Sequence, residues 1–137
     1  MSSYISNSLK KQVAERAGYR CEYCLLREST SFFTFHVDHI ISQKHGGPTA
    51  LDNLAYGCPD CNHFKGSDIA TISENDRDTI VRFFNPREDN WTDHFELQEG
   101  AIYGKTPIGI ATIKIFRFND VERVIFRKAL LAMKQWP

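Results

Sequence analysis

The first regular hydrophobic pattern in the chain lies at residues 8–17, SLKKQVAERA. Leu9 and Val13 recur at a spacing of four, which places them on one face of a helix. Ser8 can cap the start of this helix, and Gly18 can end it in a left-handed conformation. The sequence therefore predicts a helix over 8–17 that buries one face and leads to the first cysteine.

Aromatic and β-branched side chains dominate residues 32–41, FFTFHVDHII, as is typical of a strand. Because side chains alternate between the faces of a strand, three apolar and three polar positions separate. One face carries Phe33, Phe35 and Val37, and the other carries Thr34, His36 and Asp38. We expect Phe32, Phe33 and Phe35 to lie in the core rather than to stack on nucleic-acid bases.

A polar loop with a Gly-Gly-Pro turn follows this strand. Residues 54–56 predict a short second strand that returns beside the first. Pro59 suits the first turn of a helix, which we expect to run to about Lys65 and to stop near Gly66. The order strand, loop, strand, helix is thus enclosed by the two cysteine pairs of the chain.

The second half of the chain has a less regular pattern. Residues 77–84 fit either a helix or an extended segment, and residues 91–95 fit a mixed loop or a hairpin. Short strands are predicted at 102–103 and 106–108. With the elements of the first half, this pattern predicts an α+β fold.

Residues 119–134 predict a final helix, with Asn119 as its cap and Glu122 placed for a capping box. Residues 112–137 contain six basic and two acidic side chains, whereas residues 74–99 contain eight acidic and three basic ones. One side of the final helix carries Arg123, Arg127 and Lys134. This basic face either contacts nucleic-acid phosphates or packs on the acidic middle segment.

Composition places the chain among ordinary globular proteins, with 42% hydrophobic and 25% charged residues. No apolar run approaches the roughly 18 residues that span a bilayer, and the N-terminal residues do not resemble a secretory leader. Seventeen basic and seventeen acidic side chains cancel, which argues against general coating of nucleic acid. We expect a cytoplasmic protein with no membrane association and at most a local basic patch.

Four cysteines form two CxxC pairs, CEYC and CPDC, separated by 33 residues. Two such pairs, Cys21 with Cys24 and Cys58 with Cys61, can place four thiolates around one ion, which is the arrangement of structural zinc. Disulfides, a redox pair and another metal are the alternatives, and a reducing compartment disfavours lasting disulfides. We expect one structural Zn²⁺ per chain that stabilises the fold, because four thiolates leave no open position for catalysis.

Between the cysteine pairs and on the second helix lie Asp38, His39, Asn53 and Asn62. Asp38 on a strand and Asn62 on the facing helix can both offer oxygen ligands to one hard cation, which suits Mg²⁺ or Mn²⁺. His39 follows Asp38 and can stay off the metal, where a neutral imidazole suits a general base. Asn53 can fix the backbone near His39 by hydrogen bonds across the loop.

Three segments, RAGYRCEYC, FHVDHIISQKHGG and LDNLAYGCPDCNHFKGSD, resemble the HNH endonuclease family, over about residues 16–68. The resemblance implies a ββα-metal core, also called a His-Me finger, over residues 1–70 with the zinc site. Residues 71–137 would form a mixed C-terminal extension, packed on the core and ending in a helix. Parts of it, from FFNPREDNWTDHF to IYGKTPIGIATI, resemble the tail of small stand-alone bacterial HNH proteins.

The resemblance also implies a reaction. His39 would take a proton from water, and the hydroxide would attack the phosphorus of a DNA phosphodiester. The cation on Asp38 and Asn62 would stabilise the departing 3′-oxygen, so that products carry 5′-phosphate and 3′-hydroxyl ends. Nothing in the sequence reads a 2′-hydroxyl, so RNA cleavage is one alternative, and a non-catalytic, zinc-stapled nucleic-acid-binding module is another.

The chain departs from the family pattern at Gly66, where members with a three-histidine site carry histidine. This departure favours a Mg²⁺-type site over a zinc- or nickel-type catalytic site. Ser42 replaces a common proline, for which we expect no catalytic consequence. Three further residues are candidate substrate contacts: Lys65, one turn after Asn62, His36 on the strand face of Asp38, and His63 on the helix.

Overall fold

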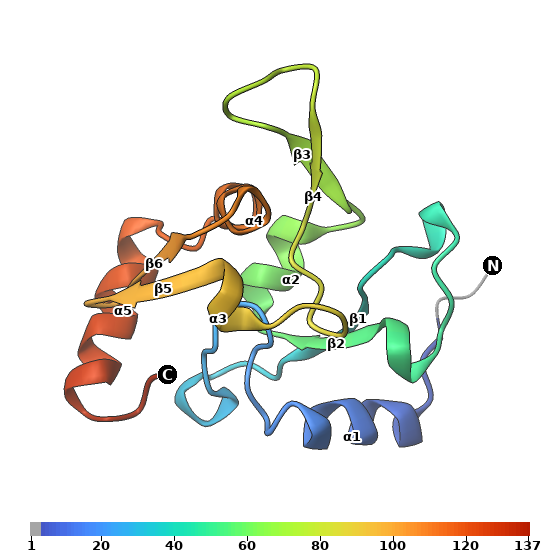
Figure 1. Cartoon of the computed structure of the whole chain (residues 1–137). Helices are drawn as coiled ribbons and strands as arrows, with labels where there is room; N and C mark the ends of the chain where they lie inside the picture. Colours follow the sequence, from blue (N-terminus) through green and yellow to red (C-terminus); the bar gives the residue numbers. More distant parts are fainter. Residues whose placement is uncertain (1–3) are drawn as a thin grey trace.

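The computed structural model describes residues 4–137 and has the predicted α+β architecture. Its helices are α1 (Asn7–Arg16), α2 (Pro59–Lys65), α3 (Trp91–His94), α4 (Pro107–Phe116) and α5 (Val121–Ala132). Its strands are β1 (His36–His39), β2 (Leu54–Gly57), β3 (Ala70–Ile72), β4 (Ile80–Arg82), β5 (Phe95–Gln98) and β6 (Ala101–Gly104). Within the described residues, each strand pairs with one neighbour, so the strands form three separate antiparallel pairs (Figure 1).

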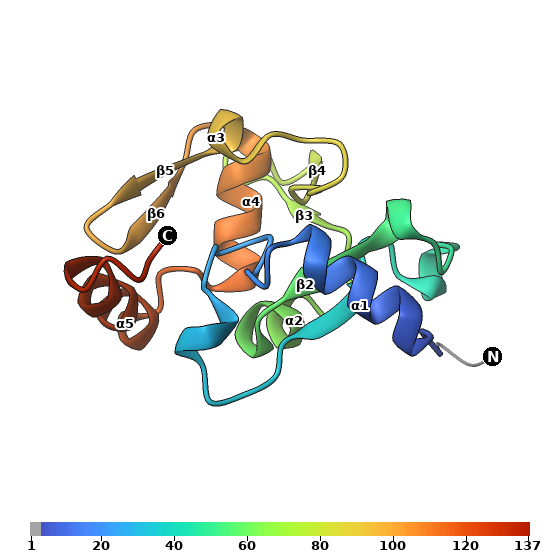
Figure 2. The ribbon, with the colours of Figure 1, turned by 90° about the horizontal axis from the view of Figure 1, so that it is seen from below.

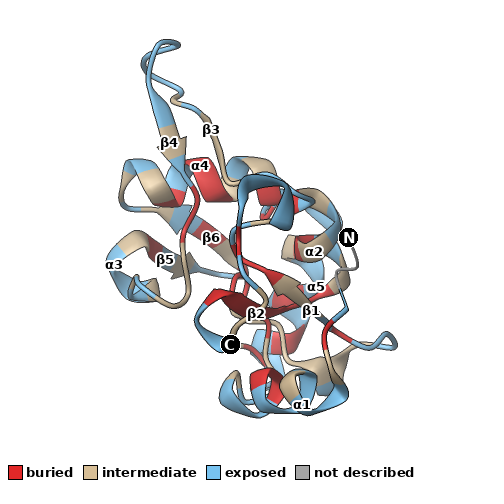
Figure 3. Ribbon diagram, turned by 90° about the vertical axis from the view of Figure 1, so that its right-hand side faces the viewer, coloured by how far each residue is buried: buried red, intermediate tan, exposed pale blue. Residues whose placement is uncertain are grey.

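The pair β1–β2 and the helix α2 form the unit that carries the candidate site. The register runs from His36 opposite Gly57 to His39 opposite Leu54. Every residue of β2 is buried, and β2 appears red through the centre of the molecule in Figure 3. Helix α1 packs against this pair from one side, while α2 packs against both of its strands. The order β1, loop, β2, α2 is the ββα arrangement that the sequence predicts.

Helix α1 begins one residue before the predicted start. Ser6, not Ser8, is its cap, because the Ser6 hydroxyl accepts a hydrogen bond from the Leu9 amide at 3.2 Å. Val13 on the predicted inner face is completely buried. Gly18 follows the helix with φ +64°, which confirms the predicted left-handed ending.

Strand β1 is shorter than the predicted segment 32–41, because its partner β2 offers only four residues to pair with. Phe35 lies in the core at 4% exposure, as predicted. The expectation for Phe32 and Phe33 is wrong: they precede the paired part of the strand and are 103% and 70% exposed. No strand pairs with residues 32 and 33, so their side chains have no sheet surface to pack against.

The predicted strand at 106–108 is instead the start of helix α4. The Thr106 hydroxyl caps it by accepting a hydrogen bond from the Gly109 amide at 3.1 Å, and Pro107 occupies the first turn. Figure 2 shows α4 between the β5–β6 and β3–β4 pairs, and it also contacts α2. Residues 77–84 form a turn followed by the strand β4, which projects with β3 from the body as a hairpin (Figure 1).

Helix α5 starts at Val121, so Asn119 is not its cap and instead forms hydrogen bonds with Ile102. The Asn119 side chain accepts from the Ile102 amide and donates to the Ile102 carbonyl, at 2.9 and 2.8 Å. The predicted basic face is also wrong, because Arg123 and Arg127 are only 8% and 2% exposed. Neither faces a phosphate or the acidic middle segment; both point into the molecule.

One hydrophobic core joins the two halves of the described chain. It includes Leu54 and Tyr56 from the first half and Phe116, Phe118 and Trp136 from the second. The second half therefore packs on the first, while the division at residue 70 stays a prediction. No helix between residues 4 and 137 is long and apolar enough to cross a bilayer.

Candidate active site and metal centre

The four cysteines converge on one buried point. Cys21 and Cys24 lie in the loop after α1, and Cys58 and Cys61 lie at the start of α2. Their sulfur atoms all fall within 4.8 Å of one another. In each pair a backbone amide points at the first sulfur: Cys24 N to Cys21 Sγ at 3.5 Å, and Cys61 N to Cys58 Sγ at 3.4 Å. The geometry is that of a single four-ligand centre.

The donor set of this centre fits zinc. Four sulfur atoms in a closed, buried cluster match the tetrahedral, all-thiolate coordination that structural zinc prefers. Hydrogen bonds from the neighbouring thiols lower the pKa of Cys24, whereas burial raises the pKa of Cys61. Several thiolates can share so small a buried volume only if a cation compensates their charge. The cysteines therefore form a zinc-type site that joins the loop after α1 to α2.

An open pocket of about 390 Å³ contains three of the four predicted catalytic residues. Asp38 and His39 from β1 and Asn62 from α2 line it together. Asp38 and Asn62 are half-buried, and each can present an oxygen atom to the pocket. Its remaining lining residues are Ser42, Gln43, Lys44, Gly66 and Ser67.

The imidazole of His39 is held by the loop that follows β1. His39 is only 6% exposed, and its Nε2 lies 2.8 Å from the hydroxyl oxygen of Thr49. The side-chain amide of Gln43 donates to the same hydroxyl at 3.4 Å. The Thr49 hydroxyl can accept from or donate to Nε2, and in the tautomer in which Nε2 donates, Nδ1 carries the lone pair.

Asn53 fastens both ends of the same loop. Its Oδ1 accepts from the Ile41 amide, and its Nδ2 donates to the carbonyls of Ile41 and Pro48, all at 2.9 Å. Gly47 lies against this contact, where a Cβ atom would come 1.7 Å from the Ile41 carbonyl oxygen. The Asn53 carbonyl also accepts from the Ile40 amide at 2.8 Å, so Asn53 fixes the two residues after His39, close to the role that the sequence predicts.

Comparison with family models shows which known family this part of the chain resembles. Residues 21–68 match the model of the HNH endonuclease family. These residues form an HNH endonuclease domain. The match begins at Cys21 and ends at Asp68, so it contains all four cysteines and the whole predicted motif. The family that this model describes is one of endonucleases.

A curated relative extends the similarity beyond the HNH domain. Septu protein PtuB of Bacillus thuringiensis is 22% identical over 128 residues, which cover 92% of this chain. The aligned part is 47% of PtuB, so the chain spans about half the length of this relative. No solved structure matches the chain.

Lys65 supports the HNH site from inside the domain. It is 4% exposed, and its ammonium donates to the His39 carbonyl oxygen at 3.1 Å. Burial lowers the pKa of Lys65, while the charges of Asp38 and Asp68 oppose that shift. An ammonium this buried does not support the predicted contact with a phosphate. Its hydrogen bond to the carbonyl oxygen indicates that Lys65 holds the His39 backbone.

The two candidate histidines of the HNH domain are not among the residues that line the pocket. His36 is exposed at the start of β1, and His63 is exposed with its ring 5.2 Å from that of Phe64. Sequence reasoning missed Thr49 and Lys44. Thr49 reaches His39 only through the path of the loop, which no spacing rule predicts. Lys44 lies in the same loop, five residues after His39, and no motif marks it.

Proposed function

We propose that the chain is a divalent-metal-dependent endonuclease that hydrolyses DNA phosphodiester bonds with His39 as general base. The observation that carries the proposal is the convergence of Asp38, His39 and Asn62 on one open pocket. A carboxylate, an imidazole and a carboxamide within one pocket are what metal-assisted hydrolysis of a phosphodiester needs.

Asp38 and Asn62 are the residues that would hold the divalent ion. Their oxygen atoms suit Mg²⁺ or Mn²⁺, which accept carboxylate and amide ligands with water filling the other positions. When bound, the ion would stabilise the charge on the departing 3′-oxygen, which is otherwise a poor leaving group. This geometry fits products with 5′-phosphate and 3′-hydroxyl ends.

His39 is placed to move a proton through Nδ1. Its Nε2 is 2.8 Å from the Thr49 hydroxyl, and with Nε2 as the donor in this contact, Nδ1 is the nitrogen that accepts a proton from water. Lys65 holds the main chain at the His39 carbonyl, and Asn53 holds it two residues later at Ile41. These contacts fix the ring relative to the pocket without direct contact to the substrate.

Lys44 is the cation that the pocket offers to a phosphate. It is exposed and lines the pocket with Asp38 and His39. A mobile ammonium at the rim can attract the backbone next to the cleaved bond as a point charge. The single positive charge fits weak contact to the backbone rather than recognition of a base sequence.

A plasmid-nicking assay with Mg²⁺ or Mn²⁺ tests this function. We expect His39→Ala to lower the rate by at least about 100-fold, the smaller end of the usual contribution of a general base. His45→Ala is the matched control, because His45 is exposed and lies outside the pocket lining. Zinc content and the circular dichroism spectrum should be the same in all three proteins.

The outcomes separate the alternatives. Nicking by His39→Ala at the wild-type rate would show that the general-base assignment is wrong. Duplex DNA, single-stranded DNA and RNA should be digested side by side, because cleavage of RNA alone would replace the DNA proposal with an RNA nuclease. Binding without cleavage under every divalent ion would indicate a non-catalytic zinc-stapled module.

A further inference from the structure

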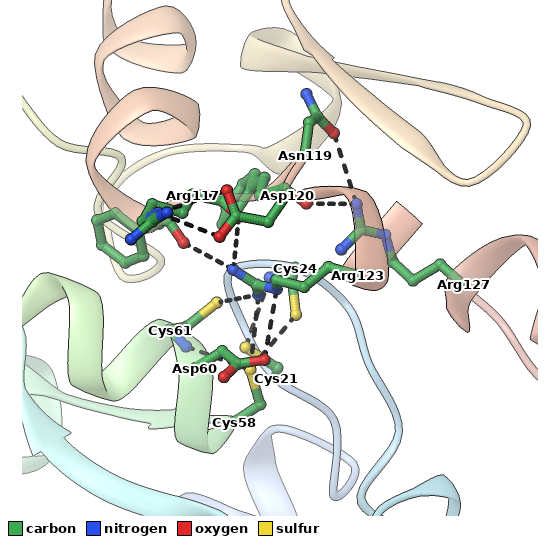
Figure 4. Close-up of polar contacts among 12 residues, drawn as sticks. Cys21, Cys24, Cys58, Asp60, Cys61, Arg117, Asn119, Asp120, Arg123 and Arg127 are labelled. Carbon is green, nitrogen blue, oxygen red and sulfur yellow. Dashed lines mark hydrogen bonds and ion pairs between the residues drawn. The ribbon is translucent and has the colours of Figure 1, made fainter. Parts of the chain in front are cut away.

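Arg123 of α5 points its guanidinium at the cysteine centre (Figure 4). Its Nη2 lies 3.2 Å from Cys61 Sγ and 3.9 Å from Cys58 Sγ. Its Nη1 donates to the carbonyl oxygens of Phe116 and Arg117 at 2.6 and 3.0 Å. The main chain at the end of α4 therefore holds one side of the guanidinium, and the other side faces sulfur.

Arg127 lies one helical turn further along α5 and is buried behind Arg123 (Figure 4). It donates to the carbonyl oxygens of Gly100 and Phe118 at 2.8 and 2.6 Å, and its guanidinium lies 5.5 Å from the Trp136 ring. The Trp136 indole in turn donates to the Cys24 carbonyl at 3.1 Å. Helix α5 and the segment after it therefore both contact the cysteine centre, through Arg123 and Trp136.

These buried positive charges have little carboxylate charge beside them. Asp60 lies 3.6 Å from the Arg123 Nε, but its side chain is 60% exposed, so water screens the pair. Across residues 4–137, no carboxylate approaches the Arg127 guanidinium closely enough to form an ion pair. Carbonyl oxygens satisfy the N–H groups, but they do not neutralise a buried charge.

Negative charge at the sulfur atoms would compensate the positive charges of the two buried guanidinium groups. Four neutral thiols would leave both guanidinium groups uncompensated, whereas Zn²⁺ bound by four thiolates has a formal net charge of about −2. We propose that Arg123, backed by Arg127, compensates the charge of the zinc–thiolate centre, so that bound zinc anchors the C-terminal extension to the HNH domain. The proposal does not depend on the nuclease reaction.

The contact acts in both directions. Hydrogen bonds from Arg123 to sulfur stabilise the thiolates and so favour the bound metal. When the metal leaves and the four thiolates take up protons, the negative charge that α5 faces is lost, and the buried Arg123 then favours exposure to water. Zinc affinity and the docking of α5 are therefore coupled by the same free energy.

Zinc affinity tests the first half of the coupling. We would measure it by competition with a chromophoric chelator for the wild type, Arg123→Gln, Arg123→Lys and Lys128→Gln. Lys128 is the matched control, because it lies exposed on the same helix and loses the same charge. We expect a loss of about 10- to 100-fold for Arg123→Gln, a smaller loss for Arg123→Lys, and less than about twofold for Lys128→Gln. Wild-type zinc affinity in Arg123→Gln would overturn the proposal.

Hydrogen exchange of the unmodified chain tests the second half and needs no variant to fold. After zinc removal, amides of α5 should exchange at least about tenfold faster, while amides of α1 change less. Helix α1 is the internal control, since its contacts run to β1 and β2. Equal acceleration of α1 and α5 would mean that zinc stabilises the whole chain uniformly, and would overturn the anchoring of the extension.

Discussion

Asn53 gives the sharpest test of how the loop after β1 is held. Asn53→Ala removes three hydrogen bonds of 2.9 Å from a side chain that is 6% exposed. At about 1 kcal/mol of net stabilisation for each bond, the expected loss in the free energy of unfolding is about 2–4 kcal/mol. Asn53→Asp should be at least as damaging, because it turns the amide donor toward Ile41 and Pro48 into a second acceptor facing their carbonyl oxygens.

Urea unfolding in the presence of excess zinc measures this effect. The midpoint should fall for both Asn53 variants while the slope with urea stays constant, since the change is in stability rather than in the exposed surface. Asn75→Ala is the control, because Asn75 is exposed in the β3–β4 hairpin. The nicking rate of folded Asn53→Ala should also fall, because the loop presents Thr49 to His39. Unfolding free energies of Asn53→Ala and wild type within about 0.5 kcal/mol would refute this account.

Two further predictions concern the groups around His39. Thr49→Val removes the hydrogen-bond partner of Nε2 and should lower the nicking rate by about tenfold or more, whereas Thr49→Ser should keep the wild-type rate. Unchanged nicking by Thr49→Val would show that Thr49 has no part in the mechanism. Burial lowers the pKa of Lys65, so the unfolded chain binds more protons than the folded one between that lowered pKa and 10.5. The free energy of unfolding of the wild type, relative to that of Lys65→Met, should therefore rise with pH through this window. Urea unfolding at pH 8 and pH 10.5 can measure this difference. A difference that falls with pH would contradict a lowered pKa for the buried Lys65.

The parts of the fold set by local chemistry were predictable from the sequence. The CxxC spacing fixes where two thiols can meet, and Pro59 together with the second pair fixes the start of α2. The adjacent Asp38 and His39 leave β1 in different directions, which is why the sequence predicts separate roles for them. The grouping of these residues with Asn62 in one pocket is as the sequence suggests, while their chemical roles stay predictions.

The parts set by tertiary contacts were not predictable. Residues 107–116, PIGIATIKIF, carry enough β-branched side chains to suggest strands, and they form a helix because elements on several sides cover it. Phe33 alternates correctly but has no partner strand beside it. The sequence predicts Arg123 on a basic face that contacts phosphates or packs on the acidic middle segment, because charged side chains are rarely buried, and the cysteine centre beside its guanidinium accounts for its burial.

Burial of the cysteine centre beneath α5 and Trp136 has a consequence for synthesis. The ligands end at Cys61, but Arg123 and Trp136, which contact the cysteine centre, come much later in the chain. Chains emerge from the ribosome in sequence order, so the sulfur atoms are all available well before their cover has been made. The nascent chain can thus load its metal while the sulfurs are still accessible, and the last helix then closes over an ion that is already in place.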